Sequence, residues 1–297
     1  KIVGIANSFF KRSYLLVQLF RFEFVFIYRE ALPFGPPLFE WFIAKVLRKK
    51  IIYDFDDAIW HTDLSKNQWF KIWLRNPSKT NKIIKWSYKV SCGNEYLCDH
   101  ARKFNSNVVL NPTTIDTENL HNRIKNQDTD KIVIGWTGSH STLKYLDPLI
   151  PIIKKLEEKF TFEFLVICNK KPEWKLNSLK FKPWNKETEI DDLMEINFGL
   201  MPLPNDEWAK GKCGFKALQY MALGMPALIS PVGMNTELIE NGIDGFLCDT
   251  AEDWEKYITL LLTDHKLRIE MGSKTRKKII THYSVQSNKE NFLSLFS

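Results

Sequence analysis

The feature that most constrains the fold is an alternation of short β-branched runs with helical stretches, which begins at Lys131. Lys131–Trp136 (KIVIGW) is typical of a buried strand, Thr137–His140 of a turn, Leu143–Phe160 of a helix and Phe162–Cys168 of the next strand. The pattern continues with a strand near Phe181, a helix over Glu187–Ile196, a strand over Phe198–Leu203, a helix over Phe215–Leu223 and a strand over Pro226–Ser230. This alternation predicts an α/β doubly wound parallel sheet, covered on both faces.

The first half of the chain repeats this pattern in part. It predicts strands over Phe24–Tyr28, Lys50–Tyr53, Lys89–Cys92 and Asn107–Leu110, and a helix over Pro37–Leu47. With the polar connector Asp116–Asp130, we expect two Rossmann-like domains, residues 1–125 and 126–297, that face each other across a cleft. Ligands of such sheets bind at the carboxyl ends of the strands. The last helices are predicted over Ala251–Leu262, Lys266–His282 and Ser287–Phe296, and we expect the final one to pack back on the first domain.

Composition excludes several other classes of protein. A chain of 297 residues with 44% hydrophobic residues can bury a large core. The apolar stretch Leu15–Tyr28 contains Gln18, Arg21 and Glu23, so it is neither a membrane span nor a signal peptide. The five cysteines form no CxxC pair, which favours reduced thiols in a cytoplasmic protein over disulfides or a metal cluster.

The net charge of +7 lies entirely in the first half. Residues 1–130 carry 20 basic and 13 acidic side chains, whereas residues 131–297 carry 22 of each. From Leu64 to Asn94 there are seven Lys or Arg residues and no Asp or Glu, with Trp69, Trp73 and other aromatic residues between them. Such a stretch suits an anionic membrane surface, for example the inner face of the plasma membrane, and equally a solvated helix with its aromatic side chains in the core. Nucleic acid ranks lower, because no binding motif accompanies the patch.

Two segments of the second half are candidates for binding phosphate. In Ile132–His140 (IVIGWTGSH), Gly135 and Gly138 permit close backbone approach and Ser139 is placed to cap a helix, although a purely structural turn would look the same. The segment Gly211–Gly224 (GKCGFKALQYMALG) is more specific. Its glycines and lysines direct backbone N–H groups and two cations to one point after a strand, where a diphosphate would fit.

The string GFKALQYMALGMPALISPVGMNTELIENGIDGFL resembles the donor-binding signature of the retaining glycosyltransferases of family 4, which have the GT-B fold. In the first half, YDFDDAIW (Tyr53–Trp60), GNE (93–95) and Asn111-Pro112 resemble the acceptor domain of that family. The resemblance extends from about Phe24 to Phe296. It implies a nucleotide sugar, such as a UDP- or GDP-sugar, held by the C-terminal half and an acceptor held by the N-terminal half, with no cofactor and no metal.

The resemblance also assigns residues at the donor site. Lys216 and Lys212 would neutralise the diphosphate, because Trp136 stands where many members have arginine and Lys144 is an uncertain replacement for the family's lysine. The donor-binding candidates are Gly135, Thr137, Gly138, Ser139, Gly214, Phe215, Gln219 and Glu237. The two glutamates of the family fall on Gly211 and Gln219, so the sugar must be recognised differently, through Asp206, Glu207 or Glu237, while Gln219 contacts the ribose.

The DFDD run, Asp54 to Asp57, allows two interpretations. A DxD pair binds a metal in the other large glycosyltransferase fold. Here the run follows a strand of the first domain, where the related family often has an active-site histidine at the position of Asp56. We therefore expect Asp56 to orient the acceptor or to stabilise oxocarbenium charge, although it is equally placed to cap a helix. Asp57, Asn94 and Glu95 are further candidates on the acceptor side, and His61 is a weaker one.

These observations predict a retaining, metal-independent hexosyl-type glycosyltransferase of cell-surface polysaccharide or glycoconjugate synthesis. The alternatives are an epimerase or hydrolase of sugar nucleotides with the same fold, or a non-catalytic module that binds nucleotide sugars or membranes, which the missing carboxylates favour. The acceptor would be a sugar, lipid-linked or protein-linked. We also expect the first strand and its glycine-rich loop to precede Lys1, because two domains of this kind usually need more residues.

Overall fold

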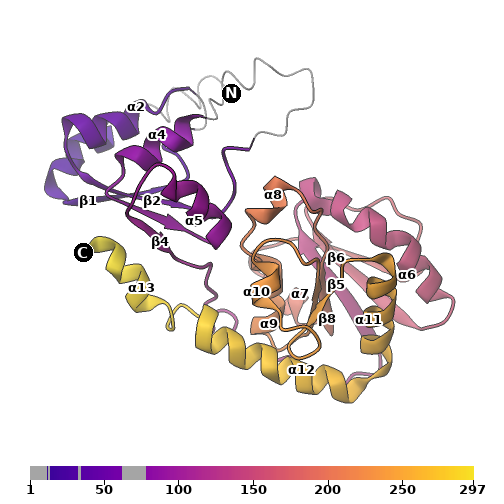
Figure 1. Cartoon of the computed structure of the whole chain (residues 1–297). Coiled ribbons are helices and arrows are strands. Elements are labelled where there is room, and N and C mark those ends of the chain that lie inside the picture. Colours follow the sequence, from indigo (N-terminus) through magenta and orange to yellow (C-terminus); the bar gives the residue numbers. More distant parts are fainter. Residues whose placement is uncertain (1–11, 13, 33–34, 62–77) are drawn as a thin grey trace. The chain divides into compact units, whose positions relative to one another are not determined.

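The computed structural model describes residues 12, 14–32, 35–61 and 78–297, and the chain forms two compact units (Figure 1). Unit 1 comprises Lys1–Pro112, Lys210–Cys213 and Glu290–Ser297, and unit 2 comprises Thr113–Ala209 and Gly214–Lys289. The contacts thus divide the chain after Pro112, whereas the sequence pattern placed the division after residue 125. Two short segments from late in the chain join the first unit. Glu290–Ser297 overlaps the final helix that we expected to pack back on the first domain, whereas nothing in the sequence pattern pointed to Lys210–Cys213.

Unit 1 is built on a parallel sheet with the strand order β1-β2-β3-β4. The strands are β1 (Phe24–Tyr28), β2 (Lys50–Phe55), β3 (Lys89–Cys92) and β4 (Val108–Leu110). The helical elements are η1 (Leu19–Arg21), α2 (Leu38–Trp41), η2 (Phe42–Val46), α4 (Ser78–Trp86), α5 (Glu95–Arg102), α13 (Lys289–Leu293) and η5 (Ser294–Phe296). Strand β2 lies in the core, since Ile51, Ile52, Tyr53 and Phe55 have no exposed surface. Its β-branched and aromatic residues favour a central strand.

Unit 2 is built on a second parallel sheet with the order β10-β9-β8-β5-β6-β7. Its strands are β5 (Ile132–Gly138), β6 (Phe162–Cys168), β7 (Leu179–Pro183), β8 (Phe198–Met201), β9 (Ala227–Ile229) and β10 (Phe246–Leu247). The chain runs outward from β5 to β6 and β7 and then returns to place β8 on the other side of β5. The ligand site of such a sheet lies where the strand order reverses, at the carboxyl ends of β5 and β8.

Helices cover both faces of the second sheet. They are η3 (His140–Leu149), α6 (Ile150–Glu157), α7 (Glu189–Leu193), α8 (Glu207–Lys210), α9 (Phe215–Ala222), α10 (Asn235–Leu238), α11 (Ala251–Thr263), α12 (His265–Lys278) and η4 (Ile279–Tyr283). One hydrophobic cluster joins the sheet to α7 and α9, and another joins it to η3, α6 and α11. Two parallel-sheet α/β units confirm the predicted fold class.

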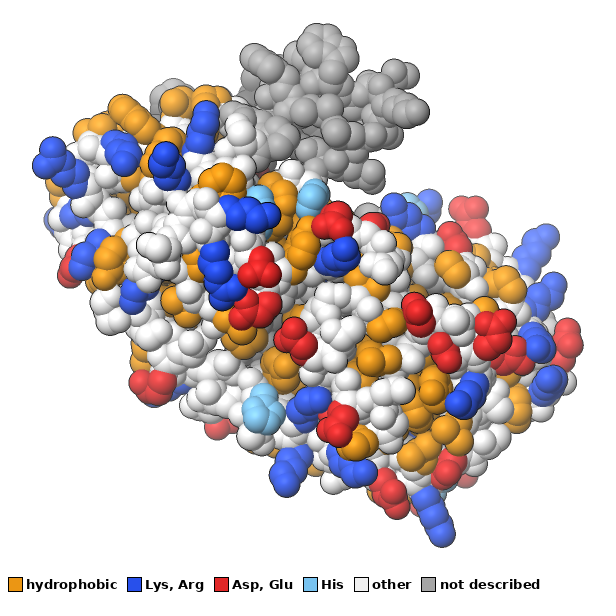
Figure 2. All heavy atoms as spheres, viewed as in Figure 1, with side chains coloured by type: hydrophobic (Ala, Val, Ile, Leu, Met, Phe, Trp, Pro, Cys, Tyr) orange, Lys and Arg blue, Asp and Glu red, His pale blue; other side chains and the backbone are white. Residues whose placement is uncertain are grey.

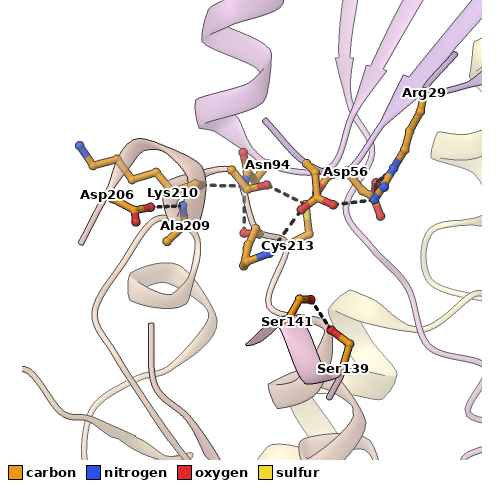
Figure 3. Close-up of polar contacts among 12 residues, drawn as sticks. Arg29, Asp56, Asn94, Ser139, Ser141, Asp206, Ala209, Lys210 and Cys213 are labelled. Carbon is orange, nitrogen blue, oxygen red and sulfur yellow. Dashed lines mark hydrogen bonds and ion pairs between the residues drawn. The ribbon is translucent and has the colours of Figure 1, made fainter. Parts of the chain in front are cut away.

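The predicted helix over Leu143–Phe160 is wrong in one respect, because it is divided. A 3₁₀ helix, η3, ends at Leu149 and the α-helix α6 follows. Pro148 and Pro151 explain the division, since proline has no N–H group for the helical ladder. The expected side-chain cap at Ser139 is also absent: Ser139 precedes η3, but its Oγ contacts Ser141 Oγ at 2.8 Å (Figure 3).

The basic stretch 64–94 lies partly outside the described residues, since 62–77 are not described. In the described part, Lys79 is only 2% exposed and pairs with Glu30 at 3.0 Å, so it faces the interior and not a membrane. Lys82 and Lys85 are exposed on α4. Figure 2 shows Lys and Arg side chains over the visible face of unit 1, with acidic side chains among them, and a mixture of acidic and basic side chains over that of unit 2.

All five cysteines are buried thiols without disulfides. Among the helices that the structure describes, none combines the length and the apolar composition needed to cross a bilayer.

Candidate functional site

The carboxyl ends of the strands of unit 1 carry a connected set of charged side chains. Asp56 and Asp57 directly follow β2, and Arg29 directly follows β1. The Arg29 guanidinium donates to Asp56 Oδ1 at 2.8 Å and to Asp57 Oδ2 at 2.6 Å (Figure 3). The Tyr28 hydroxyl also donates to Asp56 Oδ1, at 2.8 Å. Asp56 is therefore held by an arginine and a tyrosine and does not cap a helix.

The electrostatics of this cluster follow from partial burial. Burial raises the pKa of Asp57 above its usual value, although Lys212 and Arg29 act in the opposite direction. Lys212 Nζ lies 3.7 Å from Asp57 Oδ1. Burial, together with the bond to Asp56, raises the pKa of Tyr28 to about 12, so Tyr28 is a neutral donor at physiological pH. Arg29 and Tyr28 were missed by sequence reasoning, although the rule that sites lie at strand carboxyl ends, applied to Phe24–Tyr28, would have found them.

Asn94 and Glu95 have other contacts. Asn94 is 3% exposed, and its Oδ1 accepts from Leu97 N at 2.9 Å, which caps α5. Its Nδ2 donates to the carbonyls of Lys210 and Lys212 at 3.2 and 3.1 Å (Figure 3). Glu95 is exposed and pairs with Arg102 at 2.7 Å. These contacts favour structural roles for both residues, and their predicted acceptor roles stay predictions.

The segment Lys210–Cys213 lies against the carboxyl ends of β2 and β3 within unit 1. The Cys213 thiol donates to the Asp56 carbonyl at 3.2 Å. A Cβ atom on Gly211 would lie 2.6 Å from Ala58 Cβ and 2.7 Å from Ala58 N. Close backbone approach therefore requires glycine at position 211, and a glutamate does not fit there.

In unit 2, the carboxyl end of β5 lies beside the first turn of α9. Lys216 Nζ is 5.7 Å from the centroid of the Trp136 ring, and Lys216 Cε would be 3.0 Å from a Cβ on Gly138. Gly214 precedes α9 with a φ of +67° and provides no side-chain cap. The two glycine-containing segments singled out from the sequence, around Gly138 and Gly214, thus meet at the reversal point of the strand order.

The other candidates in unit 2 differ in accessibility. Ser139 and Glu237 are exposed and Phe215 is 49% exposed, whereas Thr137 is buried and donates its N–H to Tyr220 Oη at 3.0 Å. Gln219 is 3% exposed and donates to Glu189 Oε1 at 3.3 Å. Asp206, a candidate for sugar recognition, accepts from Ala209 N at 2.7 Å (Figure 3).

Gly135 lies inside β5 and is fully packed. A Cβ there would come within 2.6 Å of three carbon atoms of the Ile196 side chain. Its register partner on β8 is Gly199, where a Cβ would overlap the Tyr220 ring. Packing under Ile196 and Tyr220 therefore explains both glycines, and the donor-binding role of Gly135 stays a prediction.

Within the described residues, no group of three or more His, Cys, Asp or Glu side chains is arranged to hold a metal ion. The DFDD run does not act as one cluster, because Asp54 accepts from Ser91 Oγ at 2.5 Å while Asp56 and Asp57 bind Arg29.

Known structures resemble this chain along most of its length. Sucrose-phosphate synthase from Thermosynechococcus elongatus has 12% identity and a TM-score of 0.66, with 93% of this chain and 73% of that one covered. HepE of Anabaena in complex with UDP and glucose has 12% identity and a TM-score of 0.70, with 96% and 81% covered. A glycosyltransferase from Rickettsia africae also has 12% identity and a TM-score of 0.70, with 100% and 81% covered. At these identities the likeness shows the fold, which is GT-B.

No curated protein matches the chain in sequence. A family model does match: the one described as glycosyl transferases group 1 covers residues 117–278, more than half of the chain. The match includes the carboxyl end of β5, the start of α9 and Glu237 of α10, where the donor-site candidates of unit 2 lie. The chain therefore belongs to the glycosyl transferases group 1 family.

Proposed function

We propose that this protein is a retaining glycosyltransferase of family 4 that transfers a sugar from a nucleoside-diphosphate sugar to an acceptor hydroxyl without a metal ion. The observation that carries the proposal is the contact between the carboxyl end of β5, at Trp136 and Gly138, and Lys216 of α9. A cation, a helix start and a glycine turn at one point suit a diphosphate. The solved complexes of HepE with UDP and with UDP-glucose support a nucleotide sugar as the donor.

In the proposed reaction the acceptor oxygen bonds to the anomeric carbon on the face that the diphosphate leaves. The bond between the anomeric carbon and the diphosphate oxygen breaks, and the acceptor proton passes to that phosphate oxygen. Lys216 and the N-terminus of α9 neutralise the leaving group, and Asp56 orients the acceptor. Lys212 pairs with Asp57 at 3.7 Å, so its role at the diphosphate stays a prediction from the sequence. Catalysis then rests on positioning and charge stabilisation.

Replacing Lys216 tests the donor site. Lys216→Ala should lower kcat/KM by about 10²-fold, the loss typical of one electrostatic contact to the reacting group. The matched control is Lys256→Ala, since Lys256 Nζ also lies over an aromatic ring, Tyr257 at 4.8 Å, but on the exposed face of α11. Near-full activity of Lys216→Ala would refute the assignment.

The donor is found by thermal shift against UDP- and GDP-sugars, because a ligand that binds only the native state stabilises it by mass action. NMR of the product reports whether the anomeric configuration is retained. Removal of divalent metal ions with a chelator should leave the transfer rate unchanged. A requirement for a metal ion would instead favour metal binding by the DFDD run, Asp54 to Asp57. Release of free nucleotide without acceptor would instead indicate a hydrolase, and binding without turnover a non-catalytic module.

We further propose that the acceptors belong to cell-surface polysaccharide or glycolipid synthesis and are met at an anionic membrane. The exposed Lys82 and Lys85 on α4 support this, because each cation near such a surface contributes about 1 kcal/mol. The variant Lys82→Ser/Lys85→Ser should sediment less with vesicles containing phosphatidylserine. Unchanged, salt-insensitive sedimentation would count against a membrane role for α4.

A further inference from the structure

Arg29 has an unusual backbone conformation at a prominent place. Its φ is +58°, in the left-handed region that side chains other than glycine and asparagine seldom adopt. It is the first residue after β1, and its N–H donates to the Asp54 carbonyl at 2.8 Å. Strained backbone of this kind persists only where the surrounding structure enforces it, and it gathers at functional sites.

Buried charged side chains anchor the residues that follow Arg29. Glu30 pairs at 3.0 Å with Lys79, which is 2% exposed and also donates to the carbonyl of Leu32. The Ala31 N–H donates at 2.8 Å to Glu40, which is 1% exposed. The residues that follow Arg29 are thus tied to α4 and α2, and the guanidinium is left pointing across the ends of β1 and β2 (Figure 3).

The guanidinium divides its donors between two carboxylates. Nε and one terminal nitrogen bind Asp56 Oδ1 at 3.0 and 2.8 Å, and the same terminal nitrogen binds Asp57 Oδ2 at 2.6 Å. Within the described residues, the donors to the Asp56 carboxylate all meet Oδ1, which leaves Oδ2 for a ligand. The Asp56 side chain is 39% exposed, so a ligand can reach it.

The net charge around Asp56 and Asp57 determines which kind of ligand group can bind there. Arg29 and Lys212 offset Asp56 and Asp57, and each cation is already paired with a carboxylate. A phosphate or carboxylate on the acceptor would meet Asp56 Oδ2 and be repelled. A hydroxyl group is uncharged, so it can donate a hydrogen bond to that oxygen without electrostatic repulsion. A carboxylate held in a fixed geometry is a strong acceptor of such a bond.

We infer that Arg29 is a positioning residue that holds Asp56 and Asp57 in place to receive an uncharged sugar hydroxyl of the acceptor. The inference deepens the proposed glycosyltransferase function and rests on it. Glycine would adopt the backbone conformation of Arg29 without strain, but it has no side chain to hold the two carboxylates. The inference therefore explains why arginine occupies this strained position: its side chain is needed for substrate recognition.

Arg48 provides the matched control. Its φ is +52°, it is exposed, and it follows η2 away from the two carboxylates. Both Arg29→Gly and Arg48→Gly relieve the same backbone strain, so an effect of relieved strain alone would be common to the two variants. Only Arg29→Gly frees Asp56 and Asp57.

The experiment measures KM for acceptor and donor separately, with a panel of alkyl glycosides and their phosphorylated counterparts. Arg29→Gly should raise the acceptor KM at least tenfold and leave UDP binding unchanged, while Arg48→Gly should match the wild type. Arg29→Lys should give an intermediate acceptor KM, because an ammonium keeps the charge but lacks the planar array of donors that fixes the geometry of the two carboxylates. The acid limb of the profile for kcat/KM of the acceptor should move to higher pH in Arg29→Gly, because the positive charge that lowers the pKa of Asp57 is gone while Lys212 and Asp56 remain.

Three results would overturn the inference: equal acceptor KM values for Arg29→Gly and wild type, an unmoved acid limb, or a preference for phosphorylated acceptors. If the glycine variant does not fold, Arg29→Asn takes its place, because asparagine also tolerates this backbone region. A wild-type protein that binds no nucleotide sugar would refute the proposed function itself, and UDP binding by the wild type separates the two failures.

Discussion

Gly135→Ala gives a sharp test of how unit 2 is packed. A Cβ at this position would lie within 2.6 Å of three carbon atoms of Ile196, whose side chain has no exposed surface. Strand β5 cannot move away, because Gly135 pairs with Leu165 of β6 on one side and with Gly199 of β8 on the other. We expect a loss of about 2 kcal/mol in the free energy of unfolding, within the roughly 1–3 kcal/mol that overpacking costs.

A double-mutant cycle with Ile196→Ala separates this clash from other effects. Ile196→Ala alone should cost about 2–5 kcal/mol, because it leaves a cavity. In the double variant the new methyl group occupies part of that cavity, so its loss should fall below the sum of the single losses by about 1–3 kcal/mol. Urea unfolding, followed by the intrinsic fluorescence of the ten tryptophans and by circular dichroism, measures each value. Additive losses, or a Gly135→Ala variant within 0.5 kcal/mol of the wild type, would refute the packing argument.

The same variants decide whether Gly135 also contacts the donor. If the glycine serves packing alone, the folded double variant should bind UDP with the affinity of the wild type. A folded double variant with weakened UDP binding would instead support the donor contact predicted from the sequence.

The other predictions concern stability. Thr250→Ala removes one half of the capping box with Asp253 and should cost about 1 kcal/mol by thermal unfolding. Burial lowers the pKa of His100 to about 4, so between about pH 6.5 and 4 the unfolded state binds a proton that the native state does not. The free energy of unfolding of unit 1 should therefore decrease as the pH falls through this range. In urea titrations His100→Gln should make this free energy less dependent on pH. Asn94→Ala removes a helix cap and two bonds to the segment at 210–213, so amide exchange in that segment should quicken.

Local sequence patterns predicted the strands well because burial and β-branching act over a few residues. Phe24–Tyr28, Lys89–Cys92 and Phe162–Cys168 form strands with the predicted bounds. The helix predicted over Leu143–Phe160 is divided after Leu149. The apolar spacing alone predicts one helix, but Pro148 and Pro151 interrupt its hydrogen-bond ladder. Strand β10, only two residues long, carries too little pattern to be noticed.

At the candidate sites, prediction from the sequence is limited by side-chain pairs between residues that lie far apart in the chain. Arg29 meets Asp56 across 27 residues of sequence, and Lys79 reaches Leu32 across 47. The strand-end rule could have singled out Arg29 as a candidate, because it follows the predicted strand Phe24–Tyr28. Its pairing with Asp56 and its positive φ could not be read from the sequence.

The two glutamates expected from family 4 are missing for different physical reasons. At Gly211 the backbone packs against Ala58 and leaves no space for a side chain. At Gln219 the amide donates to Glu189, so a carboxylate from α7 already lies beside it. A glutamate at 211 would therefore clash, and one at 219 would place two like charges together. Neither substitution would restore the family arrangement, so the roles of the two glutamates cannot be transferred to this chain position by position.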